Sequence, residues 1–213
     1  MNRLKVIATS GIILFCLLMV RALLTKGYSW FFDSIFSILV IIFCFFYSEK
    51  LKLTKISFCL VIFALFLHNA GIFGFYGSSP VSLPWDHVTH FVGLFAVGIF
   101  FFNYFKNQIN FNHLCSFSNF FILFIILLAS LGIGSLIENI EFTGYLTLGN
   151  GEGVLMYGEG DGIIDIADTD MINIAGGGWF NAMRDLVVNL LGALLGILIM
   201  VLSEKLKIKF NKV

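Results

Sequence analysis

Six long, predominantly apolar stretches constrain this chain more than any other feature of its sequence. A helix of roughly 20 apolar residues spans the hydrocarbon core of a bilayer. Lipid-exposed strand edges would leave backbone groups unpaired, and the alternating pattern of a membrane barrel is missing, so each stretch is predicted to be a helix. The expected fold class is all-α: a polytopic membrane protein with about six transmembrane helices in one bundle. The stretches cover Val6–Leu24, Phe31–Tyr47, Ile56–Phe75, Val88–Phe105, Phe117–Ile140 and Leu186–Leu202.

The composition excludes several other classes of protein. Of the 213 residues, 59% are hydrophobic and only 12% are charged. These values rule out a soluble globular enzyme and an intrinsically disordered chain. A net charge of +0 suggests no basic face, so the lipid bilayer and not nucleic acid is the expected partner. No disulfide or thiolate metal site is expected, because no paired spacing is found among Cys16, Cys44, Cys59 and Cys115.

The basic residues predict the orientation of the helices. Lysine and arginine favour cytoplasmic loops. With the N-terminus inside, only Arg21, Lys26 and Arg184 fall outside, so both termini are predicted to be cytoplasmic. The start also resembles a signal peptide, but no small-residue cleavage site follows, and we interpret it as a retained helix. The other ten basic residues are Arg3, Lys5, Lys50, Lys52, Lys55, Lys106, Lys205, Lys207, Lys209 and Lys212.

One long loop, from about residue 142 to 183, is predicted to face outward. Nine of the 13 acidic residues lie between Glu138 and Asp185, together with many glycines. Several carboxylates on a flexible loop are typical of calcium sites, and the run from Asp161 to Asp170 invites that interpretation. Its spacing fails the EF-hand pattern, so a solvated, charged loop is the simpler alternative.

Polar residues of four predicted helices converge near the outward face. Ionisable groups inside membrane spans are costly, so they normally turn inward, find partners and mark a site. Residues three or four apart share one helix face. The pairs Asp86 and His90, Glu138 and Glu141, and Asp185 and Asn189 have this spacing, and each pair is expected to point at one focus. His68 with Asn69 lies in the outer half of the third span.

The chemistry of these side chains suits a metal ion or acid–base catalysis. Carboxylates and an imidazole are ligands for a divalent cation, and a metal-bound water is a usable nucleophile. The hypothetical metal ligands are Asp86, His90, Glu138 and Glu141, and Asp185 joins them as a candidate catalytic group. Without a metal, the same groups offer a general acid and base. Three further residues are assigned to substrate binding: Arg184, Asn189 and His68.

Each of these residues also has a purely structural interpretation. Asp86 could cap a helix after Pro84, with His90 merely pairing with it. Glu138 or Glu141 could pair with Arg184, and Asn189 could make an interhelical hydrogen bond. His68 could simply be packed. Gly192 and Gly196 have the spacing of close helix packing and are interpreted as structural.

The order of these motifs resembles the YjdF-type family of bacterial inner-membrane proteins and, more distantly, VanZ-like membrane proteins. The resemblance implies a bacterial cytoplasmic (inner) membrane location. VanZ-like proteins are associated with tolerance to a glycopeptide antibiotic that acts on the cell wall, which implies a lipid-linked or envelope substrate. The motifs are His68-Asn69, Trp85-Asp86-x-x-x-His90-Phe91, Glu138-x-x-Glu141, Gly158-Glu-Gly-Asp161 and Arg184-Asp185-Leu-Val-Val-Asn189.

Three functions are therefore open at this point. The first is an extracytoplasmic pocket that binds, and hydrolyses or transfers, the polar head group of a lipid-linked envelope substrate. The second is an ion- or proton-coupled transporter. The sequence argues against it, because Phe, Ile and Leu dominate the cytoplasmic halves of the spans and no polar path continues there. The third is a non-catalytic membrane assembly protein in which the polar residues only hold the bundle together.

Overall fold

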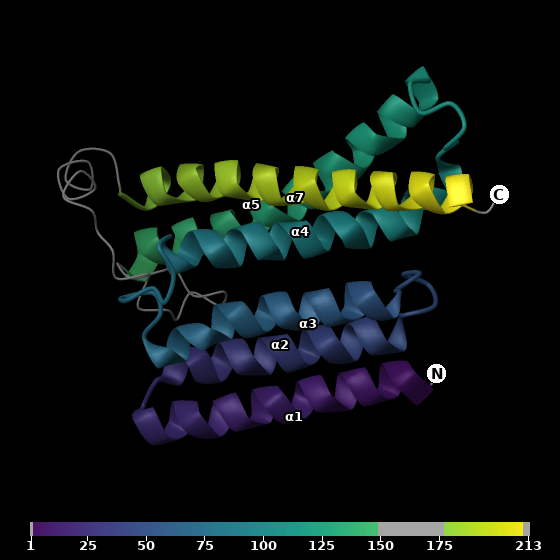
Figure 1. Ribbon diagram of the computed structural model, residues 1–213. Coiled ribbons are helices and arrows are strands. Elements are labelled where there is room, and N and C mark those ends of the chain that lie inside the picture. The colour runs from purple at the N-terminus through teal and green to yellow at the C-terminus, as the bar shows by residue number, and fades with distance from the viewer. Residues whose placement is uncertain (1, 149–176, 211–213) are drawn as a thin grey trace.

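The computed structural model describes residues 2–148 and 177–210, and in these two ranges the regular structure is helical (Figure 1). Six helical segments are long and apolar enough to cross a membrane. The predicted all-α class and the predicted span count are both confirmed. The elements are α1 (Asn2–Thr25), α2 (Tyr28–Phe46), α3 (Lys55–Asn69), η1 (Ala70–Phe73), α4 (Trp85–Phe105), η2 (Lys106–Gln108), α5 (Phe117–Leu148) and α7 (Gly177–Phe210).

The helices pack as two groups of three that meet where α3 contacts α4 (Figure 1). The first group, α1 to α3, encloses a core that includes Phe15, Ile41 and Phe58. The second group is α4, α5 and α7, and its core includes Phe102 and Ile126. Large apolar side chains elsewhere on the helices point outward, as a lipid environment requires.

Small residues let α4 and α7 approach each other closely. A Cβ added to Gly192 would collide with the carbonyl oxygen of Phe91, and a Cβ added to Gly196 would lie 2.5 Å from the carbonyl oxygen of Phe95. The backbones of the two helices are therefore in direct contact, as the spacing of these glycines predicts. This close contact brings the side chains at the start of α4 and near the start of α7 to one place.

The helix ends differ from the predicted ones. Both ends of the predicted loop of residues 142–183 are helical, because α5 continues to Leu148 and α7 already begins at Gly177. Helix α5 continues beyond Glu141, which follows the fifth apolar stretch, and α7 begins before Arg184, which precedes the sixth. The calcium candidate between Asp161 and Asp170 and the Gly158–Asp161 motif lie outside the described residues.

The two ends of the bundle carry different residues. The start of α1 and the end of α7 lie together at one end (Figure 1). The starts of α2, α4 and α7 and the ends of α3 and α5 share the opposite end (Figure 1). We call this second end the site end, because the polar residues identified from the sequence lie there. Which end faces the cytoplasm stays a prediction from the distribution of lysine and arginine.

Candidate functional site

Six side chains from three helices form a buried polar cluster at the site end, which we call the carboxylate–histidine cluster. Helix α4 provides two of them, α5 two and α7 two. None is more than 9% exposed, and Asp185 and Asn189 are completely buried. The structure thus brings together the three helix pairs that spacing alone predicts to share a focus. The members are Asp86, His90, Glu138, Glu141, Asp185 and Asn189.

His90 lies at the centre of the cluster. Its Nε2 is 3.3 Å from Asp86 Oδ1 and 3.9 Å from Glu141 Oε2. Its Nδ1 is 3.1 Å from Glu138 Oε1. Carboxylate oxygens of three residues thus face the two ring nitrogens, and an ionised carboxylate only accepts hydrogen bonds. The ring is therefore placed to balance negative charge on both of its sides.

Asn189 connects the three helices of the second group. Its Nδ2 donates to Glu138 Oε1 at 3.0 Å, and its Oδ1 lies 3.3 Å from His90 Nδ1. Gly134 on α5 makes room for this amide, because a Cβ there would lie 3.0 Å from Asn189 Nδ2. The interhelical hydrogen bond that the sequence suggests is present, and it also orients two members of the cluster.

The cluster holds more negative charge than its own histidine can balance. Asp185 has two buried oxygens without a hydrogen bond among the described residues, and the Nε2 of His87 lies 3.8 Å from its Oδ1. Asp86 Oδ2 and Glu138 Oε2 are likewise buried and unbonded within the described ranges. With both histidines protonated, the four ionised carboxylates would still leave an excess of two negative charges. Such a group needs protons or a cation to be stable in an apolar bundle.

The spacing of the ligand atoms fits a metal ion. Ligand atoms of Asp86, His90 and Asp185 lie within 4.8 Å of one another, and so do those of His90, Glu138 and Glu141. Oxygen ligands with one imidazole suit divalent cations such as Mn²⁺, Fe²⁺ or Zn²⁺. The four ligands predicted from the sequence are divided between these two groups, which share His90, and Asp185 completes the group that contains Asp86. That they hold a metal stays a prediction.

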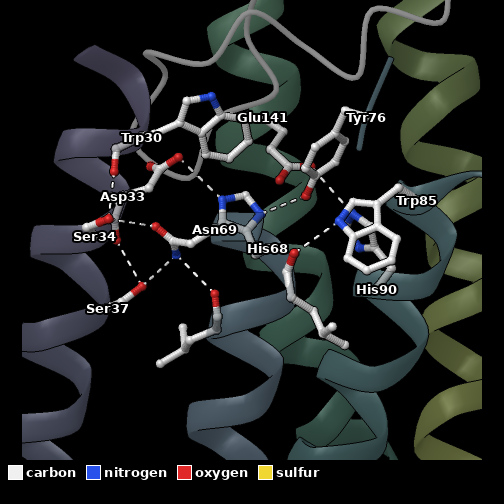
Figure 2. Close-up of polar contacts among 12 residues, drawn as sticks. Trp30, Asp33, Ser34, Ser37, His68, Asn69, Tyr76, Trp85, His90 and Glu141 are labelled. Atoms are coloured by element: carbon white, nitrogen blue, oxygen red, sulfur yellow. Dashed lines mark hydrogen bonds and ion pairs between the residues drawn. The ribbon is translucent and has the colours of Figure 1, made fainter. Parts of the chain in front are cut away.

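A second polar group lies beside the cluster and contains residues that the sequence analysis missed (Figure 2). His68 Nε2 is 3.3 Å from Asp33 Oδ2 on α2, and the Tyr76 hydroxyl is 3.0 Å from His68 Nδ1. We call these three residues the Tyr76–His68–Asp33 relay. His68 is therefore not packed alone on an apolar face, nor is it a member of the carboxylate–histidine cluster. Asp33 could have been found from the sequence, because it is an acidic residue inside a predicted membrane span.

A network of small polar groups fixes the relay between α2 and α3. Asn69 donates to Ser37 Oγ at 3.0 Å and accepts from Ser34 Oγ at 3.0 Å (Figure 2). The Trp30 ring stacks on the Tyr76 ring, with centroids 5.7 Å apart. A Cβ on Gly71 would collide with both rings, so glycine is needed for this stack.

The environment of Tyr76 keeps its hydroxyl protonated. Burial raises the pKa of Tyr76 well above its ordinary value, and the nearby Asp86 carboxylate raises the pKa further. The same phenol interacts with the Thr89 side chain and is within electrostatic range of Glu141. Tyr76 therefore connects the relay to the carboxylate–histidine cluster.

The start of α4 resolves one structural alternative. Asp86 is not a cap: the N-cap of α4 is Pro84, and Asp86 lies in the first turn. The start of α4 is held instead by Trp85, whose Nε1 donates to the Leu67 carbonyl at 3.0 Å. Arg184 is exposed one position before Asp185, and its role in binding substrate stays a prediction. All four cysteines are free, as expected.

These features define a polytopic helical membrane protein with buried carboxylates and imidazoles at one end of its bundle. The chain belongs to the family described as "Predicted membrane protein (DUF2238)", which matches residues 5–205. A search of curated proteins found no match. A search of solved structures found none either. The resemblances to YjdF-type and VanZ-like proteins, and the inner-membrane location, stay predictions.

Proposed function

We propose that the carboxylate–histidine cluster binds a divalent cation and that the protein hydrolyses the head group of a lipid-linked substrate of the cell envelope. One observation carries this proposal: three buried carboxylates lie within 3.9 Å of the His90 ring, and a ligand atom of a fourth, Asp185 on α7, lies within 4.8 Å of those of Asp86 and His90. A divalent cation would balance the excess negative charge and occupy the unbonded oxygens of Asp86, Glu138 and Asp185. Close packing of α4 against α7 would hold two of the ligand-bearing helices in place.

The ligand set supports hydrolysis of an ester or a phosphoester. Asp86, His90, Glu138, Glu141 and Asp185 would hold the cation, which supplies a Lewis acid and an activated water when it is bound. Asn189 would orient His90 and Glu138 through its two hydrogen-bonding contacts. Because these side chains come from three helices, the chemistry would depend on correct assembly of the second helix group.

The position of the site supports an amphiphilic substrate. Asp86 lies in the first turn of α4, so the cluster is close to the end of a membrane-spanning helix. A lipid-borne head group reaches this level by diffusing in the plane of the membrane. Exposed Arg184 at the same end would contact an anionic head group such as a phosphate. The distribution of basic residues favours an extracytoplasmic site.

The transporter alternative has less support. The core of the second helix group on the far side of the cluster is formed by Phe102, Ile126 and Ile197. A polar pathway along the described part of these helices would have to pass this apolar layer.

The assembly alternative, in which the cluster only holds helices together, predicts that its charges matter for stability and not for ligand binding.

The first test is the metal content of the detergent-purified protein, measured by mass spectrometry. We expect about one divalent ion per chain in the wild type, and a content at least about tenfold lower in Glu138→Gln and in Asp185→Asn. Glu204→Gln, which removes a carboxylate near the end of α7 remote from the cluster, is the matched control and should retain the ion. An ion-free wild type would contradict the proposal.

The second test is hydrolysis of a short-chain phosphatidic acid and of a short-chain lipid carboxylic ester in detergent. We expect one of the two to be hydrolysed by the wild type and by Glu204→Gln, and not by Glu138→Gln. Thermal stability of the same samples identifies the assembly alternative. In that case the cluster variants would melt at a lower temperature, and neither the wild type nor any variant would contain metal.

A further inference from the structure

The Tyr76–His68–Asp33 relay is more polar than packing requires. Asp33 is only 2% exposed, and its Oδ1 has no hydrogen bond among the described residues. A buried carboxylate beside an imidazole costs free energy unless its charge is used or compensated. The neighbouring contacts of Asn69 with Ser34 and Ser37 already join α2 to α3 without any charge. The relay is therefore a candidate for a function beyond holding these helices together.

The geometry fixes a direction for the hydrogen bonds. Ionised Asp33 accepts a hydrogen bond only, so His68 Nε2 at 3.3 Å carries the proton between them. In the neutral ring, Nδ1 is then an acceptor, and the Tyr76 hydroxyl at 3.0 Å donates to it. A hydroxyl, an imidazole and a carboxylate in this order are the arrangement of a general base with its orienting acid.

The relay ends at the carboxylate–histidine cluster. Tyr76 interacts with Thr89, one position before His90, and is within electrostatic range of Asp86 and Glu141. Figure 2 shows Tyr76 and Glu141 adjacent, between His68 and His90. The phenol oxygen is therefore the atom of the relay that is nearest to the cluster's chemistry, while His68 and Asp33 lie behind it on α3 and α2.

We propose that the relay is the proton acceptor of the site, with Tyr76 as a catalytic residue and His68 and Asp33 as positioning residues. This proposal rests on the proposed hydrolysis. The attacking water gives a proton to the Tyr76 oxygen while the Tyr76 proton moves to His68 Nδ1. The water oxygen forms a bond to the ester carbon or phosphorus. When the bond to the leaving oxygen breaks, the proton returns from His68 through Tyr76 to that oxygen.

This sequence of steps conserves protons and suits the environment of each group. Tyr76 is neutral before and after each transfer, in keeping with its partly buried, acid-rich surroundings. The positive charge appears on His68, next to the Asp33 carboxylate. The stacked Trp30 ring and Gly71 hold the phenol in place during both transfers. A relay of this kind needs the tyrosine hydroxyl and not only its ring.

The first test uses ¹⁵N NMR of histidine-labelled protein in detergent, at a pH where neutral imidazole predominates. The chain has four histidines, so a His68→Gln variant assigns the relevant signals. We expect His68 to be protonated at Nε2, and its Nδ1 signal to shift in Tyr76→Phe. The matched control is Tyr104→Phe on α4, far from the relay, which should leave the signal unchanged. A proton on Nδ1, or an unchanged signal in Tyr76→Phe, would overturn the proposal.

The second test compares hydrolysis with metal content in the same variants. Tyr76→Phe and His68→Gln should keep the cation of the wild type and lose about 10²-fold or more in hydrolysis rate, which is the usual contribution of acid–base catalysis. Retained activity in Tyr76→Phe would overturn the relay while leaving the metal site intact. If the wild type holds a cation but hydrolyses neither lipid, the proposed function fails, and the NMR result alone decides whether the relay exists.

Discussion

Asn189 illustrates how a single buried side chain at this site contributes to the stability of the folded protein. It is completely buried and contacts groups on two other helices, His90 on α4 and Glu138 on α5. Removing it would leave a buried carboxylate oxygen and a ring nitrogen with one partner fewer. The cost of an unsatisfied buried polar group is about 1–3 kcal/mol.

We therefore expect Asn189→Ala to lower the free energy of unfolding by about 1–3 kcal/mol. Unfolding in a mixed detergent titration measures this change. Asn139→Ala on α5 is the control, because Asn139 is exposed and, among the contacts described, its side chain donates only to the Ser135 carbonyl of its own helix. Equal effects of the two substitutions would contradict the role given to Asn189.

The environment of Tyr76 predicts how the stability of the protein changes at alkaline pH. Its folded-state pKa is raised by burial and by Asp86, so above the ordinary tyrosine pKa the unfolded chain releases this proton while the folded chain keeps it. Stability is therefore lost as the pH rises above about 10. Tyr76→Phe lacks this contribution, and its melting temperature should fall less steeply with pH than that of the wild type.

Absorbance at the tyrosinate band measures the same group directly. The chain has six tyrosines, and we expect Tyr76 to contribute nothing to the tyrosinate absorbance of the folded protein. The wild type and Tyr76→Phe should then show the same alkaline rise in absorbance before unfolding. A smaller rise in Tyr76→Phe would show that Tyr76 titrates with the others.

At the scale of residues, the carboxylate–histidine cluster could be predicted and the relay could not. Spacing of three and four along one helix already places Asp86 with His90 and Glu138 with Glu141. The relay instead joins His68 to Asp33, 35 positions away on another helix, and to a tyrosine in a connecting segment. Such pairs depend on which helices are neighbours, and periodicity within one helix carries no information about that.

Among the helices, α4 and α7 depend most on small residues. Gly192 and Gly196 allow the two backbones to touch, and neither position leaves room for a methyl group. Overpacking at such a contact costs about 1–3 kcal/mol. The contact also sets the separation of Asp86 from Asp185, one on each helix.

We expect Gly192→Ala to reduce both the stability of the protein and its content of bound cation. Gly93→Ala is a close control, because Gly93 lies in α4 and a Cβ there would meet no atom within 4 Å. The control should be as stable as the wild type or up to about 1 kcal/mol more stable, since alanine favours the helix. Thermal unfolding and metal analysis of both variants give the answer. An unaltered Gly192→Ala protein would mean that the helices are free to separate.

The helix count could be predicted from apolar length, but the helix ends could not. Apolar stretches end where charged residues begin, and this criterion ends the fifth span at Ile140 although α5 continues to Leu148. Glutamate and arginine are good helix formers, and the backbone does not stop where the lipid stops. For the same reason α7 begins at Gly177, well before the predicted Leu186.

For the molecule as a whole, an orientation in the membrane follows from its two unlike ends. The site end holds buried acidic clusters, whereas lysines such as Lys50, Lys52 and Lys207 lie towards the opposite end. The excess of basic residues predicts that this opposite end is cytoplasmic.

Cysteine labelling tests this orientation. In a variant lacking the four natural cysteines, Ser78→Cys marks the site end and Glu49→Cys marks the opposite end, and both positions are exposed. We expect a membrane-impermeant maleimide to label Ser78→Cys in intact bacterial cells and to label Glu49→Cys only after permeabilisation. The reverse pattern would place the site in the cytoplasm and exclude an extracytoplasmic substrate.

The distance along the chain between the partners of the cluster has a consequence for biosynthesis. His90 meets Asn189 across 99 positions, so at about 5–20 residues per second α4 waits roughly 5–20 s for α7 to be synthesised. During that interval Asp86 and His90 lie in the bilayer without their α7 partners, while α1 to α3 already have a core of their own. The hydrogen bond from the Trp85 indole to the Leu67 carbonyl lets the nascent α4 pack against α3 during this interval. A chain that ends before Gly177 would keep its acidic groups permanently unmatched, and we expect the proteases of membrane quality control to remove it.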